Sequence, residues 1–522
     1  MKKRLIILLI FILSLVMRLA FLLNIESFWG DEATYFNLSR LPIKQLISGH
    51  YWDFPTHPFL MLLFLKFWSF FSLAENWLRL PSVLFSLISI FYLYKLSAYL
   101  FMNKKAALIS LFLLGFSTYN IKLSAESRYT NLVFLLETAS LYYFIKILNR
   151  ASDLKNDILL YIKFILVSFL GIISDYSFFW LFFSYLFFLL YRLIKMNARA
   201  VFNKDKPLYA SLILTLTLFL PWIGKFISSL PLSYKDIRNI TPPTFSGIYE
   251  TVLAFLVAYP NKYGINAPFT EWGVPLGNLT YLIFSLVLFI SLLISLFLRN
   301  KYKLPAIIVI ISLLPMTLSF LAGQKVPIFI AFNLLIVHLG LILLLVNLIN
   351  QKKPFGIFLL IIYLFLNSVS YRVLLNYETK KEDWKYLYEY LTNKNLKSRD
   401  ALIIYPGFNK FLLEYYSLKT KSPGEFNIID LYDENTVKED LSIALRNHKF
   451  QNICLLTYPD DTNSKIIEKY LITDYKLVTT KTFPQSNSVN CFAEASLLLL
   501  NHSIPGRNRT AIGGLGNLYS IR

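Results

Sequence analysis

Long, uninterrupted apolar segments are the feature that most constrains this chain. Residues 281–298 read YLIFSLVLFISLLISLFL, which approaches the length of about 20 residues that crosses a bilayer as a helix. Membrane β-barrels instead show short segments of alternating hydrophobicity. With 56% hydrophobic and 16% charged residues, the composition also excludes a soluble enzyme, a disordered chain and a disulfide scaffold. We therefore expect a polytopic α-helical membrane protein.

One of the apolar segments, residues 58–73, differs from the others. It is short, carries Lys66 near its middle and is rich in Phe and Trp, a pattern typical of a helix that lies in the membrane interface. We therefore expect eleven of the twelve apolar segments to cross the membrane. The twelve are 4–24, 58–73, 80–101, 106–119, 129–148, 158–174, 177–194, 208–229, 276–298, 304–322, 327–349 and 355–375.

The distribution of basic residues predicts which loops face the cytoplasm. With eleven spans, the loops of one side carry 17 Lys and Arg in 41 residues, and the loops of the other carry 10 in 117. Because basic loops stay in the cytoplasm, we expect a cytoplasmic N-terminus and an extracytoplasmic C-terminus in the cell or inner membrane. The net charge of +21 arises mainly from short loops between apolar segments, so we expect membrane lipids and no nucleic acid as partners.

The chain divides by composition near residue 375. Residues 1–375 form the predicted membrane module, with large outer loops at 25–79 and 230–275, and residues 376–522 form an α/β domain outside the cytoplasm. Candidate strands are 400–405, 427–431, 451–457 and 475–481, and the tail from about 494 has no assigned role. Cys454 and Cys491 lie in this domain, where we favour two buried thiols, although an oxidising compartment also permits a disulfide.

Candidate catalytic residues gather in the first outer loop. Asp31 and Glu32 follow the first span directly and begin a short amphipathic helix. A carboxylate at this place is a candidate general base or metal ligand, or simply suits the dipole at a helix N-terminus. Farther along, His57 precedes Pro58 where the interfacial segment begins. It is therefore a candidate hydrogen-bond donor to a phosphate oxygen, or an interfacial anchor.

A second set of polar residues lies where later spans meet the same face. Glu126, Arg128 and Tyr129 precede one span, and an arginine there can bind a lipid phosphate in bidentate fashion or anchor its helix in the interface. Asp175 lies in a short turn on this face and is a further pocket candidate. Arg18, inside the first span, lies near enough to its outer end to serve the structure.

These motifs together resemble the polytopic GT-C glycosyltransferases that use polyprenyl-phosphate sugars, especially protein O-mannosyltransferase-like enzymes and the lipid A aminoarabinose transferase. The resemblance covers roughly residues 5–230 and, more loosely, 376–420. It rests on the order of W-G-D-E at 29–32, H-P at 57–58, R-L-P-S at 79–82, A-E-S-R-Y at 125–129, L-P-W at 220–222 and E-D-W at 382–384.

The resemblance implies an inverting glycosyltransferase that moves a hexose-type or pentose-type sugar from a lipid phosphate to a lipid, glycan or protein acceptor. It maps the catalytic carboxylate to Asp31, the donor-phosphate residues to His57, Arg128 and Tyr129, and leaves Arg79 as a pocket candidate. A divalent metal is compatible with this chemistry, but the sequence does not require one. One departure is the segment 325–333, where Phe332 and Asn333 stand in place of an Arg-Tyr pair.

The main rival interpretation is a lipid or glycan transporter, or a flippase without transferase activity. Such proteins are typically built from two repeats with broken helices in corresponding positions. This sequence shows no internal repeat, and its large extra mass lies on one side only. A surface-polysaccharide polymerase and a non-catalytic membrane scaffold are weaker alternatives.

Overall fold

A computed structural model of the chain divides into two units, which are described separately. Residues 1–26 and 35–379 form the helical unit, and residues 27–34 and 380–522 form the sheet unit. The structure describes residues 2–49, 58–149, 154–195, 198–229, 242–258, 279–297, 305–351, 353–377, 384–393, 400–404, 409–420, 427–431, 452–457, 475–482 and 488–494, with single residues between 439 and 472.

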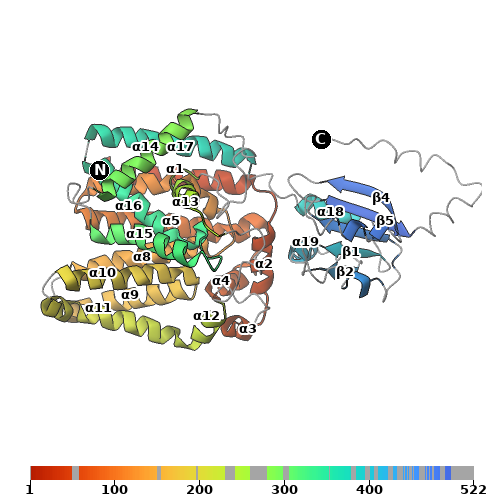
Figure 1. Cartoon of the computed structure of the whole chain (residues 1–522), viewed down its shortest axis with the longest axis horizontal. Helices are drawn as coiled ribbons and strands as arrows, with labels where there is room; N and C mark the ends of the chain where they lie inside the picture. The colour runs from red at the N-terminus through yellow and green to blue at the C-terminus, as the bar shows by residue number, and fades with distance from the viewer. Residues whose placement is uncertain are drawn as a thin grey trace, which may run out of the picture. The chain divides into compact units, whose positions relative to one another are not determined.

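The helical unit is a bundle in which long helices lie side by side (Figure 1). Ten of its helices and one bent pair, α6 and α7, correspond to the eleven predicted spans. The ten are α1 (Lys2–Asn24), α5 (Glu75–Phe101), α8 (Thr130–Leu148), α9 (Leu154–Ile172), α10 (Phe179–Lys195), α11 (Ala198–Phe219), α14 (Leu279–Phe297), α15 (Ala306–Ala322), α16 (Leu335–Gln351) and α17 (Lys353–Tyr377).

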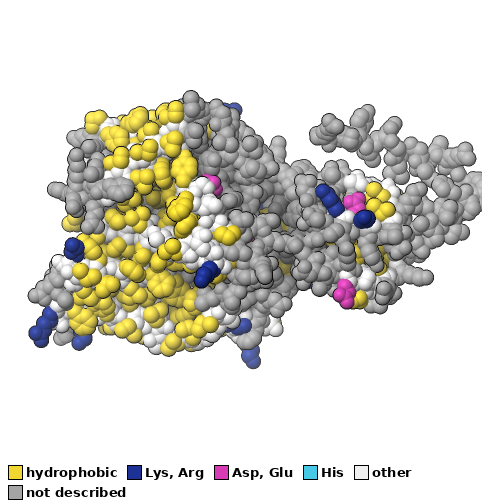
Figure 2. Space-filling model, in the orientation of Figure 1, with side chains coloured by type: hydrophobic (Ala, Val, Ile, Leu, Met, Phe, Trp, Pro, Cys, Tyr) yellow, Lys and Arg dark blue, Asp and Glu magenta, His cyan; other side chains and the backbone are white. Residues whose placement is uncertain are grey.

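Length and composition identify membrane-spanning candidates among these helices. Six are long and apolar enough to cross a bilayer, and the bent pair makes a seventh. The described parts of α9, α14, α15 and α16 are apolar over shorter lengths. Apolar side chains also cover much of the bundle's visible surface (Figure 2). Exposed apolar side chains of the helices include Leu8 at 55% exposure and Ile213 at 65%. The chain is therefore an integral membrane protein.

The segment 58–73, which was expected to lie in the membrane interface, does not form a spanning helix. Its helix α4 (Leu60–Trp68) has nine residues and is about 14 Å long, less than half of the about 30 Å of hydrocarbon. Lys66 Nζ donates to the backbone carbonyls of Ser39, Arg40 and Leu41 at 2.9–3.4 Å, which explains a lysine in an apolar segment. The helix lies at one end of the bundle (Figure 1).

Two other short helices lie near α4 at this end of the bundle. They are α3 (Ile43–Ser48) and α12 (Ile223–Ser229), the latter preceded by the 3-10 turn η2 (Leu220–Trp222). Trp222 ties them together, because its indole N–H donates to the carbonyl of Ile47 at 2.8 Å and its ring lies 5.4 Å from that of Phe59.

The predicted outer loop 230–275 contains a helix that the sequence analysis did not predict. This helix is α13 (Phe245–Val257), and its C-terminal half is buried. Two side chains of α17 bind its last carbonyls: Asn367 Nδ2 donates to Leu256 at 2.9 Å, and the Ser370 hydroxyl donates to Val257. These bonds satisfy carbonyls that a helix end otherwise leaves unpaired.

The bent pair is built around a fully buried arginine. Helix α6 (Lys104–Gly115) and helix α7 (Thr118–Ser124) meet at 57°, and Arg18 of α1 lies against the break. Its guanidinium donates to the carbonyl of Gly115 at 2.9 Å, to Asn120 Oδ1 at 2.7 Å and to the hydroxyl of Ser86 at 2.8 Å. Arg18 thus joins three helices, as its structural interpretation predicted.

The sheet unit contains a five-stranded mixed sheet of order β2-β1-β3-β5-β4. Strand β1 is parallel to β2 and β3, and β5 is antiparallel to β3 and β4. Four strands occur where the sequence predicted them, whereas β5 was missed. The elements are α18 (Trp384–Asn393), β1 (Ala401–Ile404), α19 (Lys410–Thr420), β2 (Asn427–Asp430), β3 (Asn452–Thr457), β4 (Tyr475–Thr482) and β5 (Ser488–Glu494).

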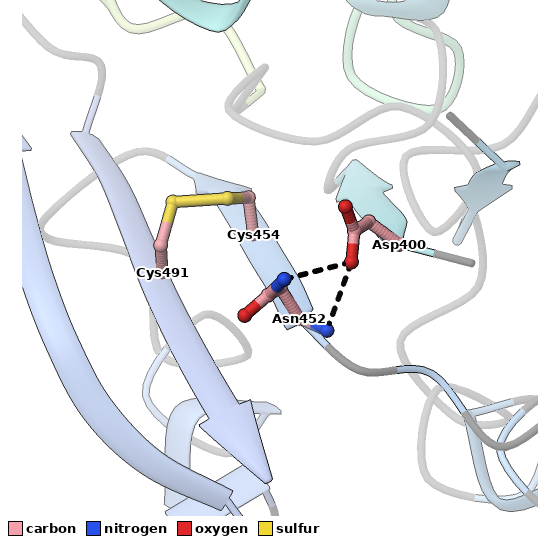
Figure 3. The surroundings of a disulfide bond; sticks show 4 residues. All are labelled: Asp400, Asn452, Cys454 and Cys491. Atoms are coloured by element: carbon pink, nitrogen blue, oxygen red, sulfur yellow. Dashed lines mark hydrogen bonds between the residues drawn. A yellow bond between two sulfur atoms is a disulfide. The ribbon is translucent and has the colours of Figure 1, made fainter. Parts of the chain in front are cut away.

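The prediction of two free thiols in this unit is wrong. Cys454 of β3 and Cys491 of β5 form a disulfide across the antiparallel pair (Figure 3). The two residues are directly opposite one another, with Cα atoms 4.0 Å apart. The sequence analysis predicts no strand at 488–494, so it does not place Cys491 beside β3. Asp400, which precedes β1, binds the start of β3 by accepting hydrogen bonds from the backbone and side-chain nitrogens of Asn452.

Candidate active site

The acidic pair lies in the first turn of helix α2 (Gly30–Ser39), and its two side chains differ in exposure. Asp31 is exposed, whereas Glu32 is fully buried. Glu32 Oε2 accepts a long hydrogen bond of 3.4 Å from the backbone N–H of Trp29. Glu32 therefore helps to hold the turn that begins α2, and Asp31 is the carboxylate of the pair that is open to solvent.

The residues before α2 are part of the sheet unit, which fixes the start of the helix. The backbone N–H of Phe28 donates to the Tyr416 hydroxyl at 3.0 Å, and the Phe28 ring stacks on Tyr415 at 4.5 Å. Both tyrosines belong to α19. The Ser27 hydroxyl accepts from the backbone N–H of Lys385 in α18. Asp31 thus stands on a segment anchored by two helices of this unit.

The second group of predicted residues surrounds Arg128, in the turn before α8. Arg128 is 5% exposed, and its guanidinium lies 3.7 Å from the carboxylate of Glu126. The guanidinium carbon is 5.0 Å from the ring centroid of Phe332 and 5.8 Å from that of Tyr129. Both rings are within cation–π range, so Arg128 is held by a negative charge and two aromatic rings.

Helix α5 holds this turn through its first residues. The Ser82 hydroxyl donates to the carbonyl of Glu126 at 2.6 Å, and the Ser127 hydroxyl donates to the carbonyl of Leu78 at 2.9 Å. Arg79, almost fully buried, donates to the carbonyl of Ile25 just after α1. Arg79 thus fixes the N-terminal end of α5, close in sequence to the serine that binds the turn.

Two further predicted residues, Tyr129 and Asp175, are both buried. Tyr129 is fully buried, with its ring 5.9 Å from that of Tyr35. Asp175 caps the 3-10 turn η1 (Tyr176–Phe178) by accepting from the backbone N–H of Ser177 at 2.8 Å. Its place in a donor pocket stays a prediction.

Two predicted features have a limited structural description. His57 lies outside the described residues. Among the residues that the structure does describe, no group of three or more His, Cys, Asp or Glu side chains could hold a metal ion. The described part of the chain therefore contains no cluster of ligands that would support metal chemistry at this site.

Phe332 is the site residue whose role the sequence did not reveal. Phe332 stands in the segment 325–333, but no local pattern predicts its contact with Arg128, about 200 positions away in the chain. Phe332 lies in the 3-10 turn η3 (Ala331–Asn333) before α16. Phe332, at which this chain departs from the pattern of the resembled enzymes, thus contacts Arg128, the residue expected to bind the donor phosphate.

A profile of the family described as dolichyl-phosphate-mannose-protein mannosyltransferase matches residues 55–224, a segment that includes Arg79, Glu126, Arg128 and Asp175. No curated protein sequence matches the chain.

Two solved structures share the fold of this chain. ArnT from Cupriavidus metallidurans, bound to undecaprenyl phosphate, superposes with a TM-score of 0.55 at 12% identity, covering 93% of this chain and 97% of ArnT. The oligosaccharyltransferase AglB from Archaeoglobus fulgidus, in complex with an inhibitory peptide and a dolichol-phosphate, superposes with a TM-score of 0.53 at 11% identity, covering 87% of this chain and 69% of AglB.

Proposed function

From the GT-C fold that this chain has, we propose that it is an inverting membrane glycosyltransferase. It moves a hexose-type sugar from a polyprenyl-phosphate donor to a lipid, glycan or protein acceptor on the outer membrane face. The observation that carries the proposal is Arg128, held by Glu126 and two rings at the start of a spanning helix. The fold likeness to ArnT, which was crystallised with undecaprenyl phosphate, supports a lipid phosphate as ligand.

Asp31 is the general base of the proposed reaction. Its exposed carboxylate takes the proton from the acceptor hydroxyl or amine as the acceptor attacks C1 of the sugar. Attack from the face opposite the phosphate breaks the C1–O bond, and the electron pair stays on the phosphate oxygen. The products are the inverted glycoside and the free polyprenyl phosphate.

Arg128 and His57 stabilise the departing phosphate. Negative charge grows on that oxygen as the C1–O bond breaks, so donors aimed at it act more strongly in the transition state than in the bound donor. A guanidinium offers two parallel N–H bonds to one phosphate. Because Glu126 and the rings already orient the group, little freedom is lost when the phosphate binds.

The proposed topology places the reaction outside the cytoplasm. The bias of basic residues gives a cytoplasmic N-terminus and eleven spans. The disulfide in the sheet unit supports this orientation, because disulfides persist in oxidising compartments. Reporter fusions after residues 103, 200 and 400 measure it: we expect cytoplasmic signals at 103 and 200 only. A cytoplasmic signal at 400 would contradict the eleven-span topology.

Transfer from a labelled polyprenyl-phosphate hexose in membranes tests the function. Asp31→Asn should lower the rate by about 10²–10⁴-fold, the usual contribution of a general base, with normal expression and insertion. Glu26→Gln is the matched control, because Glu26 is another exposed carboxylate five residues earlier. Near-normal transfer by Asp31→Asn would remove the assigned base. Absence of transfer by the natural chain from hexosyl and pentosyl donors alike, across lipid, glycan and protein acceptors, would overturn the function.

A further inference from the structure

A group of lysines and tyrosines lies at the other end of α5 and α8 from the candidate active site. The lysine–tyrosine cluster consists of Lys95, Tyr92 and Tyr99 on α5 and Tyr142, Tyr143 and Lys146 on α8. All six side chains are partly exposed on the surface of the bundle. On α5, Lys95 lies three positions after Tyr92 and four before Tyr99, and on α8, Lys146 lies four and three positions after Tyr142 and Tyr143, so Lys95 and Lys146 are each on the same face as the tyrosines of their helix.

The rings form a continuous patch across the two helices. The hydroxyls of Tyr92 and Tyr143 are hydrogen-bonded at 3.2 Å. Tyr142 packs edge-on against both Tyr92 and Tyr99, with centroid distances of 5.9 and 6.3 Å. Because the rings of neighbouring helices support one another, the patch is a built surface rather than a set of independent side chains.

Two ammonium groups flank the same ring. Lys95 Nζ lies 6.0 Å from the centroid of Tyr142, and Lys146 Nζ lies 5.7 Å from it. Lys95 Nζ is also 4.2 Å above the ring of Phe91. Phe91 lies one turn before Lys95 in α5, so its ring borders the Lys95 ammonium on this side of the cluster.

The pair of positive charges has no counter-ion within the described protein. Among the residues that the structure describes, no carboxylate lies within 4.0 Å of Lys95 or Lys146. Both lysines lie in the last two turns of their helices, which end at Phe101 and Leu148. In the proposed topology these ends meet the cytoplasmic leaflet, whose anionic headgroups bind basic pockets between membrane helices.

We propose that the lysine–tyrosine cluster is a binding site for the phosphate headgroup of an anionic phospholipid of the cytoplasmic leaflet. The two ammonium groups supply the charge, and tyrosine hydroxyls supply hydrogen bonds to phosphate oxygens. The aromatic faces and the exposed Phe91 ring border the acyl chains. A pair of lysines that merely snorkels to water would show no such preference for one headgroup.

Native mass spectrometry of the purified full chain tests the site with phosphatidylglycerol and phosphatidylcholine as probes. We expect the natural chain to retain phosphatidylglycerol preferentially. The variant Lys95→Gln/Lys146→Gln should bind it about 25-fold more weakly, since each basic residue near the membrane surface contributes about fivefold. The control Lys104→Gln/Lys105→Gln removes the same charge from exposed residues at the start of α6 and should bind normally.

Further measurements separate the site from general charge effects. Tyr99→Phe/Tyr142→Phe keeps the rings but removes two hydroxyls that can donate to phosphate oxygens, so it should weaken phosphatidylglycerol binding severalfold. Melting temperature without added lipid reports folding, and if the double glutamine variant misfolds, Lys146→Gln alone should show the fivefold loss. Equal losses in cluster and control variants, no headgroup preference, or displacement of the lipid by millimolar inorganic phosphate would each overturn the proposal.

Discussion

At the break between α6 and α7, Arg18 donates hydrogen bonds to neutral oxygens of α5, α6 and α7. In the turn before α8, Arg128 instead lies against the carboxylate of Glu126 and the rings of Tyr129 and Phe332. Both side chains are buried, at 0% and 5% exposure, so burial alone does not separate them. Their contacts separate them. Neutral acceptors from three helices suit Arg18 as a residue that holds the bundle together, whereas a carboxylate and two ring faces suit Arg128 as a residue whose guanidinium is oriented for a ligand.

The largest effect should follow from breaking the Arg18 region. Arg18→Leu removes the charged donor from the buried oxygens of Ser86, Asn120 and Gly115, and a hydrogen bond to a charged group contributes about 1.5–3 kcal/mol. Asn120 still accepts from the Ser86 hydroxyl and Gly115 from the Ser14 hydroxyl. We expect a large fall in folded yield and melting temperature, measured after extraction in a mild detergent. Arg18→Lys should also be destabilised, because one ammonium cannot reproduce the spread of a guanidinium.

A matched control separates the loss of Arg18 from the loss of a single hydrogen bond beside it. Ser14→Ala removes one hydroxyl beside Arg18 and should lower stability far less. The molecules of Arg18→Leu that do fold should transfer sugar at a near-normal rate per molecule. A well-folded Arg18→Leu that has lost transfer would place Arg18 in the active site and erase the distinction between the two arginines.

Changes at Arg128 come next in size and should show the reverse pattern. Arg128→Ala should lower transfer by about 10²–10³-fold, as expected for loss of one preorganised donor to a developing negative charge. Arg128→Lys keeps the charge but loses the bidentate fork, so we expect a loss of about tenfold. Melting temperatures should remain close to that of the natural chain. Full transfer by Arg128→Lys would mean that the arginine only anchors its helix.

The sequence predicted more of the fold than of the candidate site. The reason is that spanning helices follow from local patterns, whereas the site depends on contacts between distant residues. Apolar segments are local patterns, so the apolar helices of the bundle were predicted, as was the absence of a spanning helix in 58–73. Strand β5 reads SVNCFAE, and this short stretch with Ser and Asn lacks a clear strand signal. Missing it also hid the Cys454–Cys491 pairing, which depends on register between distant strands.

The candidate site shows the same limit. Asp31 and Arg128 were singled out because of their neighbours in the sequence, but exposure separated Asp31 from Glu32 only in the structure. The contact between Phe332 and Arg128 joins two turns about 200 residues apart. No helical or strand period reports a contact of this kind, so a departure from the resembled pattern was visible while its consequence was not.

The smallest effect, and the most specific, should come from Phe332. Its ring lies 5.0 Å from the guanidinium carbon of Arg128, and a cation–π contact of this kind contributes about 0.5–2 kcal/mol. Phe332→Leu should therefore lower transfer by about two- to thirtyfold, whereas Phe332→Tyr should retain it. Phe320→Leu is the matched control, because it removes a ring of the same region that packs on Phe245 and Phe329. In the Arg128→Ala background, Phe332→Leu should add almost nothing, since the ring acts through the guanidinium. Independent, additive losses from the two changes would show instead that Phe332 contributes to transfer without positioning Arg128.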